Sequence, residues 1–273
     1  MAELVGAAGD AATRSGNSLR DLLSQTLVLT RRLLIVWVRN PVAIVHALVM
    51  PVACLITLRI VFGDWITSIT GQNALYRSVP LMVLLGGMTG AAAGVVGINA
   101  ERHDGFLARL WALPLQRAAG LLSRLAAETI RLLVTTLVIL GTGIMLGFRF
   151  HRGALGALLW LAVPLIVGVA FSALVTTVAV YWSKAVLVEA LQPVNILAAM
   201  FCTGFAPVDR YPDWAQPLVR YQPMSQAVDA MRGLSIGGPV LWPMIGTLVW
   251  SVGIFAACLW PIAVGYRRAS TNR

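Results

Sequence analysis

Residues 154–181 read ALGALLWLAVPLIVGVAFSALVTTVAVY, and this stretch decides the fold. It carries no charged residue and exceeds the ~20 residues that a helix needs to cross a bilayer. Because backbone polar groups in lipid must be satisfied within the segment, it is predicted to be a membrane-spanning helix. Similar apolar runs occur at 42–62, 79–99, 125–146, 185–206 and 240–264. The sequence therefore predicts an all-α polytopic membrane protein with six transmembrane helices.

Composition excludes most soluble classes of protein. Hydrophobic residues make up 58% of the 273 residues, charged residues make up 12%, and the mean hydropathy is +0.80. A soluble domain carries about 25% charged residues, which argues against a soluble enzyme, a disordered chain and a nucleic-acid-binding module. The net charge is +10. We expect this positive charge to face anionic membrane lipid, with no nucleic acid as partner.

The distribution of basic residues predicts the orientation in the membrane. They are about twice as frequent in the segments assigned to one side, and basic loops stay in the cytoplasm. Both termini are therefore expected in the cytoplasm of a multi-pass protein of the cell (plasma) membrane. The predicted divisions are a mobile cytoplasmic tail (1–17), an amphipathic interfacial helix (18–40), a six-span transmembrane domain (41–266) and a cytoplasmic C-terminus (267–273).

Residues 18–40 carry the pattern of a helix that lies in the membrane interface. At 100° per residue, its leucines and Trp37 form one stripe, and its arginines lie on the opposite arc. Pro41 disfavours helix at Asn40 and should break the chain direction there. The alternative is a first spanning helix that begins early.

Two joining segments are longer than a simple turn. Residues 100–124 are charged and predicted to be cytoplasmic. Residues 207–239 are predicted to be external, and their prolines alternate with apolar and aromatic residues that do not suit a plain solvent loop. We predict a re-entrant hairpin of two short helices at the outer interface, where Trp and Tyr favour the headgroup level. Its candidate residues are Pro207, Tyr211, Pro212, Trp214, Pro223 and Arg232.

Glycines and charges inside the spans offer two further candidates. Gly86, Gly90 and Gly94 form a small-x-x-x-small run that allows close helix approach, either within the protomer or at a subunit interface that moves during transport. Charges within spans can mark an ion-coupled transporter. Here Glu128 and Arg131 are three residues apart and can pair instead, while Arg59 and Glu189 lie near span ends.

Several expected chemistries are absent from the sequence. The only lysine, Lys184, is followed by Ala185, so the chain has no Walker-type nucleotide loop. The three cysteines and three histidines are scattered, and no nucleophile motif occurs. We therefore predict no catalytic residue and no metal site.

An ion-coupled secondary transporter is the alternative function, but it predicts an internal repeat that the sequence does not show. A third possibility, a membrane-embedded lipid-modifying enzyme, would need a cluster of polar catalytic groups at one membrane face, and the sequence shows none.

The most specific stretch is ERHDGFLARLWALPLQR, residues 101–117. Gly105 follows a charged start, and Pro114 ends a short apolar helix. The stretch resembles the cytoplasmic signature of ABC-2 type permeases, the membrane subunits of one class of ATP-driven exporter. The resemblance implies that this segment couples to an ATPase. Its candidate coupling residues are Glu101, Arg102, Gly105, Leu107, Arg109, Leu110, Trp111 and Pro114.

The resemblance covers residues 18–268. A second stretch, from Phe205 to Gly237, matches the family pattern before its last span. Within the family the chain is similar to daunorubicin-resistance permeases, and residues 147–153 and 265–270 resemble a mycobacterial branch associated with export of phthiocerol dimycocerosate lipids. The resemblance implies two separate ATPase subunits that bind Mg-ATP, no cofactor in this chain, and a second permease, identical or sister. The cargo would be hydrophobic or amphipathic, an antibiotic such as an anthracycline or a lipid.

Overall fold

The computed structural model describes residues 19–103, 117–181 and 185–271, and the regular elements in these ranges are all helical. Within the described residues, four helices are long and apolar enough to cross a membrane, at Pro41–Ser68, Leu122–Met145, Gly153–Val178 and Leu241–Cys258. The predicted all-α membrane class is confirmed. The count of six spans stays a prediction.

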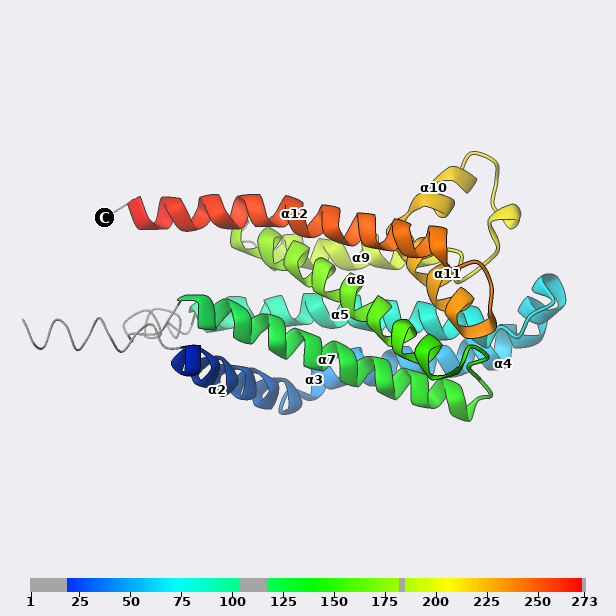
Figure 1. Ribbon diagram of the computed structural model, residues 1–273, viewed down its shortest axis with the longest axis horizontal. Coiled ribbons are helices and arrows are strands. Elements are labelled where there is room, and N and C mark those ends of the chain that lie inside the picture. The colour runs from blue at the N-terminus through cyan, green and yellow to red at the C-terminus, as the bar shows by residue number, and fades with distance from the viewer. Residues whose placement is uncertain (1–18, 104–116, 182–184, 272–273) are drawn as a thin grey trace, which may run out of the picture.

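The helices form one elongated bundle (Figure 1). In chain order they are α2 (Leu19–Val38), α3 (Pro41–Ile44), the π-helix η1 (Val45–Val49), α4 (Met50–Thr70), α5 (Leu75–His103), α7 (Arg117–Met145), α8 (Gly153–Tyr181), α9 (Ala185–Met200), the 3₁₀ helix η2 (Val208–Arg210), α10 (Gln216–Tyr221), α11 (Pro223–Ile236) and α12 (Leu241–Thr271). The start of α2 and the end of α12 lie at one end of the bundle, and α10 and α11 lie at the other.

The break predicted at Asn40 and Pro41 is present. Helix α2 ends at Val38, and α3 begins at Pro41, where the missing backbone N–H costs no hydrogen bond. The Asn40 side chain caps the new helix by accepting a hydrogen bond from the backbone N–H of Ala43 at 3.1 Å. Helix α2 is therefore separate from the long helix that follows, as the interfacial interpretation requires.

Helix α5 lies at the centre of the bundle and contacts α4, α7, α8, α9 and α11. The start of this helix, from Leu75 to Leu84, is buried almost without interruption. The main hydrophobic core surrounds this segment and includes Phe148 and Trp160, each 0% exposed. The best-packed region is therefore the end of the bundle that carries α11.

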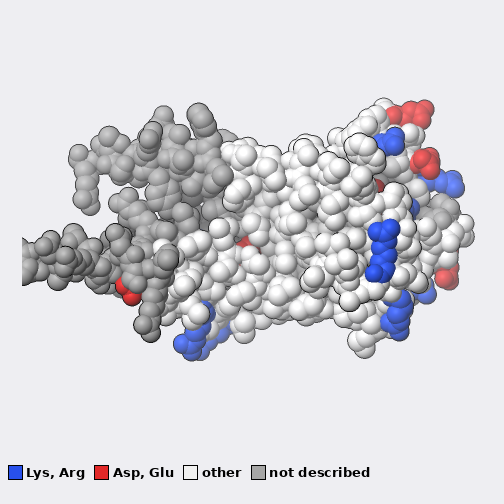
Figure 2. Space-filling model, in the orientation of Figure 1, with Lys and Arg blue, Asp and Glu red and all other residues white. Residues whose placement is uncertain are grey.

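Charge is distributed as a bilayer requires. Figure 2 shows charged side chains towards the two ends of the visible face and a nearly uncharged band between them. Large apolar side chains are exposed on the spanning helices, for example Ile60 at 77% and Leu158 at 65%. Lipid is the solvent that such a surface needs.

Candidate functional site

The end of α9 is where the structure departs from the predicted apolar runs. The run was expected to extend over 185–206, but α9 ends at Met200. The last carbonyl groups of a helix lack partners within the helix. Here they are satisfied by side chains from elsewhere: Gln222 donates to the carbonyls of Ala198 and Phe201, and Tyr211 donates to that of Met200 at 2.9 Å. The helix stops early because the hairpin caps it.

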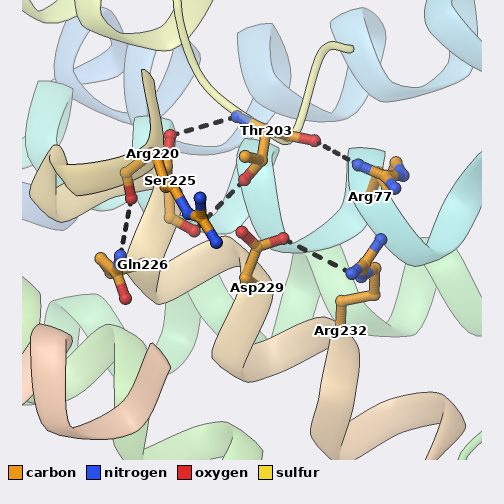
Figure 3. A network of polar contacts seen from close by, with 7 residues as sticks. All are labelled: Arg77, Thr203, Arg220, Ser225, Gln226, Asp229 and Arg232. Atoms are coloured by element: carbon orange, nitrogen blue, oxygen red, sulfur yellow. Dashed lines mark hydrogen bonds and ion pairs between the residues drawn. The ribbon is translucent and has the colours of Figure 1, made fainter. Parts of the chain in front are cut away.

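A buried polar network joins this cap to α5 and α11 (Figure 3). Arg77 of α5 donates through Nη1 to the carbonyl oxygen of Thr203 at 2.8 Å. The backbone N–H of Thr203 donates to Ser225 Oγ at 3.2 Å, and its hydroxyl donates to the Ser225 carbonyl at 3.2 Å. Arg77 is 8% exposed and Ser225 is 0% exposed. Three segments far apart in the sequence are thus tied together by bonds shielded from water.

The charged residues of the network are Asp229, Arg77 and Arg232. Asp229 Oδ1 lies 3.8 Å from Arg232 Nη2 one turn along α11 (Figure 3). Burial raises the pKa of the Asp229 carboxyl, while Arg232 and then Arg77 favour its charged form and lower it. Removing either arginine would leave the Asp229 carboxylate with less favourable electrostatic compensation.

The predicted hairpin residues take two different positions. Pro212 and Trp214 are exposed, and Trp214 is 74% exposed, as expected for a residue at a membrane surface. Pro207, Tyr211, Pro223 and Arg232 are half-buried. Burial, and secondarily the nearby Cys202, raises the pKa of Tyr211 to about 12, so its hydroxyl stays a donor to the α9 carbonyls.

The hairpin contains the two predicted helices, α10 and α11, but α11 is more deeply buried than an interfacial helix. Nine of its 14 residues are buried. It contacts α5, α8 and α12. Small side chains such as Ala227 and Gly233 allow this close approach. Helix α11 is therefore part of the bundle core.

The glycines of α5 face other helices of the same chain. A Cβ atom at Gly86 would lie 3.0 Å from Pro51 Cγ and 3.2 Å from Ile139 Cδ1, on α4 and α7. At Gly90 it would lie 3.7 Å from Arg131 Nε. This geometry favours the intramolecular packing alternative for these two glycines. Gly94 lies on α5 beyond the residues whose side chains are described, and a role of the run in a subunit interface stays a prediction.

Glu128 and Arg131, the two charges predicted to pair within a span, do form an ion pair. Arg131 donates to Glu128 on the same face of α7, and both side chains are 10% exposed. Arg59 Nη1 lies 3.8 Å from Asp64 Oδ1 near the end of α4. The Glu189 side chain lies outside the described part of α9. Within the described residues, no group of three or more His, Cys, Asp and Glu side chains could hold a metal ion.

The predicted coupling segment lies mostly outside the described residues. Glu101 and Arg102 are in the last turn of α5, with side chains that are not described. Gly105, Leu107, Arg109, Leu110, Trp111 and Pro114 fall in 104–116, outside the described ranges. Their role in coupling stays a prediction.

Sequence reasoning missed the centre of the network, which is formed by Arg77, Thr203, Ser225 and Asp229. One signal was present: Arg77 lies two residues before the start of the apolar run at 79–99, a costly place for a charge unless it has partners. The two hydroxyl residues gave no comparable signal. Thr203 and Ser225 matter because they hydrogen-bond to each other, although they are 22 positions apart in the sequence.

A bundle of helices that are long and apolar enough to cross a membrane, with large apolar side chains exposed along them, defines an integral membrane protein. The sequence profile of the ABC-2 type transporter family matches residues 24–235. The chain is 48% identical over 258 residues to a probable doxorubicin resistance ABC transporter permease protein, DrrC, of Mycobacterium tuberculosis, covering 94% of each chain. The chain therefore belongs to the ABC-2 type transporter family.

Two further relatives are more distant. The daunorubicin resistance ABC transporter permease protein DrrB1 of Streptomyces coeruleorubidus is 25% identical over 86% of this chain and 83% of its own. The doxorubicin resistance ABC transporter permease protein DrrB of Mycobacterium tuberculosis is 27% identical over 69% of this chain and 63% of its own. The predicted resemblance to daunorubicin-resistance permeases is confirmed. As a permease, the chain is a transport component, and its family implies an ATP-binding cassette partner.

Proposed function

We propose that this chain is the membrane permease of an ATP-driven exporter of hydrophobic or amphipathic compounds, with an anthracycline antibiotic as the first candidate cargo. The observation that carries the proposal is the 48% identity to a doxorubicin resistance permease over 94% of both chains. The broad apolar surface of the spanning helices suits a substrate that enters from the bilayer. The buried pairing of Glu128 with Arg131 speaks against an ion-coupled mechanism.

The exporter would contain two ATPase subunits, each binding Mg-ATP, and a second permease that is identical or a sister chain. No Walker-type loop occurs in the sequence, so the driving force would arrive by contact. The segment 100–124 is the proposed contact, with Leu107, Leu110 and Trp111 as an apolar face for a groove on the ATPase.

The cargo is tested by transport in a drug-sensitive bacterium that expresses the permease together with its ATPase. We expect lower doxorubicin accumulation than in cells whose ATPase carries a substituted Walker lysine. The second candidate cargo is a wax-like lipid of the phthiocerol dimycocerosate type, supported by the resemblance of residues 147–153 and 265–270 to that branch. Unchanged doxorubicin accumulation, with ATPase activity stimulated by such a lipid, would replace the first candidate by the second.

Coupling is tested by Leu110→Asp, with Leu218→Asp as the matched control. Leu218 is an apolar residue of α10, 61% exposed at the end of the bundle that carries α11. We expect Leu110→Asp to insert normally but to lose the ATPase on purification, while Leu218→Asp retains it. Retention of the ATPase at the normal level by Leu110→Asp would refute the assignment of the contact.

Orientation is tested by single cysteines in a background without the native ones. A cysteine at Asp213, an exposed position beside α10, should react with an impermeant thiol reagent in intact cells. A cysteine at Asn272 should not react, because both termini are proposed to be cytoplasmic. The reverse pattern would move the coupling segment to the wrong side of the membrane.

A further inference from the structure

A groove of about 630 Å³ runs along one flank of α2, where this helix meets α7. Its apolar wall is formed by four residues of α2 and one of α7, namely Leu27, Leu34, Ile35, Val38 and Ile130. Ligand pockets in proteins commonly measure 300–1,000 Å³. The groove is therefore large enough for part of one lipid chain.

The side chains of the apolar wall are exposed in the isolated chain. Leu27 is 69% exposed, Val38 is 59% exposed and Ile130 is 40% exposed. Helix α2 packs against α7 at the buried Thr30, which also lines the inner edge of the groove and whose hydroxyl donates to the Thr26 carbonyl at 2.7 Å. The groove is thus a second apolar flank of α2 that no other described element covers.

Two arginines complete the lining. Arg31 and Arg39 are both exposed, and neither forms an ion pair with a carboxylate among the described residues. The single acidic residue of α7, Glu128, is already paired with Arg131. The arginines are eight residues apart, about 12 Å along a helix. They can therefore flank one amphiphile that lies along α2, but they are too far apart along the axis to suit a small chelated anion.

We propose that this groove binds an anionic phospholipid of the bilayer, with an acyl chain against the apolar wall and the phosphate beside Arg31 or Arg39. Charge complementarity selects this occupant, because the lining combines an apolar wall with two arginines that no carboxylate of the described residues pairs. Figure 2 shows basic side chains over α2 at the border of the uncharged band, which is the depth of a headgroup. Basic pockets between helices are a recurring form of headgroup recognition. The inference concerns a component of the membrane and does not depend on the exported cargo.

The test measures lipid binding to the full-length permease, purified in mild detergent with the subunits it retains. Native mass spectrometry is used to titrate phosphatidylglycerol against phosphatidylcholine with identical acyl chains. We expect phosphatidylglycerol to be preferred. In Arg31→Gln/Arg39→Gln the preference should fall by about fivefold for each arginine removed. The matched control is Arg210→Gln, which removes an exposed arginine at the opposite end of the bundle and should leave the preference unchanged.

A second variant tests the apolar wall of the groove without changing its two arginines. Val38→Trp keeps both arginines but fills the apolar wall, so we expect it to lose bound phosphatidylglycerol. Equal binding of the two lipids by the wild type, an unchanged preference in Arg31→Gln/Arg39→Gln, or undiminished phosphatidylglycerol binding by Val38→Trp would overturn the proposal. Displacement of the lipid by inorganic phosphate alone would also overturn it, because the site would then recognise a free anion.

Discussion

Helices α2 and α11 have similar sequence patterns but opposite structural roles. Both were predicted to lie at a membrane interface, at opposite ends of the protein. In α11, nine of 14 residues are buried. In α2, Thr30 is the only buried side chain among residues 21–38. The difference shows that one short helix is part of the core, whereas the other is attached to its outside.

The contacts explain this difference. Helix α11 is held by α5, α8 and α12 and by the polar network at Thr203. Helix α2 contacts mainly α7. Substitutions around α11 should therefore change the stability of the whole bundle, and substitutions on α2 should change mainly what the protein binds. The following predictions test this division, starting with the largest expected effect.

The largest loss is expected for Arg77→Ala. The substitution leaves the Thr203 carbonyl without its donor and Asp229 with one arginine fewer in a buried region. Leaving a buried acceptor without its charged donor costs about 3 kcal/mol, which lowers Tm by roughly 10 °C in a chain of this size. Thermal unfolding in detergent can be followed by a thiol-reactive dye in a Cys54→Ala background, because the remaining cysteines are buried.

The control for Arg77→Ala is Arg210→Ala, which removes an exposed arginine from the same end of the molecule. Its Tm should change by no more than about 2 °C, since surface substitutions are nearly neutral. Equal shifts in the two variants would mean that the network contributes nothing specific to the stability of α11.

The next effect concerns the packing of α11. A Cβ atom at Gly233 would lie 2.8 Å from the Pro239 carbonyl oxygen, a backbone atom that cannot move aside cheaply. Gly233→Ala should therefore destabilise by about 1–3 kcal/mol in the same unfolding assay. Gly253→Ala on α12 is the matched control, with nothing within 4 Å of the added atom. It should be neutral or stabilising by up to ~1 kcal/mol, because alanine favours helix.

Much of the fold could be predicted from the sequence because it depends on local patterns. The helices that carry the apolar runs follow from length and hydropathy, and the break at Asn40 follows from Pro41. The early end of α9 could not be predicted this way. Its carbonyls are capped by Gln222 and Tyr211, Arg77 binds the Thr203 carbonyl just beyond it, and nothing local to residues 198–203 indicates those partners.

The candidate site was predictable only in part, for a related reason. Exposed members of the hairpin, such as Trp214, follow from composition and interface preference. The burial of Ser225 and the partial burial of Asp229 depend on which helices pack against α11, and periodicity within α11 does not identify them. Pairing of Glu128 with Arg131 was predictable because three residues separate them on one helix.

A smaller effect is expected on α5, which contacts both α11 and α7. Gly86→Ala would bring its Cβ atom to 3.0 Å from Pro51 Cγ and 3.2 Å from Ile139 Cδ1, so neighbouring side chains must shift slightly. We expect a loss of about 1 kcal/mol. Gly90→Ala should cost nothing or stabilise, since its nearest contact would be an ordinary 3.7 Å. A larger loss for Gly90→Ala than for Gly86→Ala would point to contacts of Gly90 outside this chain, such as a subunit interface.

The smallest effect is expected at the attachment of α2. Thr30 Oγ1 donates within its helix to Thr26 and lies 3.3 Å from the Ser123 carbonyl of α7, a long contact. Thr30→Val removes the donor and keeps the shape, so we expect the free energy of unfolding to fall by less than about 1 kcal/mol.

The counterpart in the network is Ser225→Ala. It removes an acceptor used by the Thr203 N–H at 3.2 Å and by Gln222 Nε2 at 2.9 Å, which weakens the cap on α9. Leaving a buried donor unpaired costs about 1–3 kcal/mol, so Ser225→Ala should lower Tm several degrees more than Thr30→Val. If Thr30→Val lowered Tm as much as Ser225→Ala, α2 would be as integral to the bundle as α11, and the division between the two helices would fail.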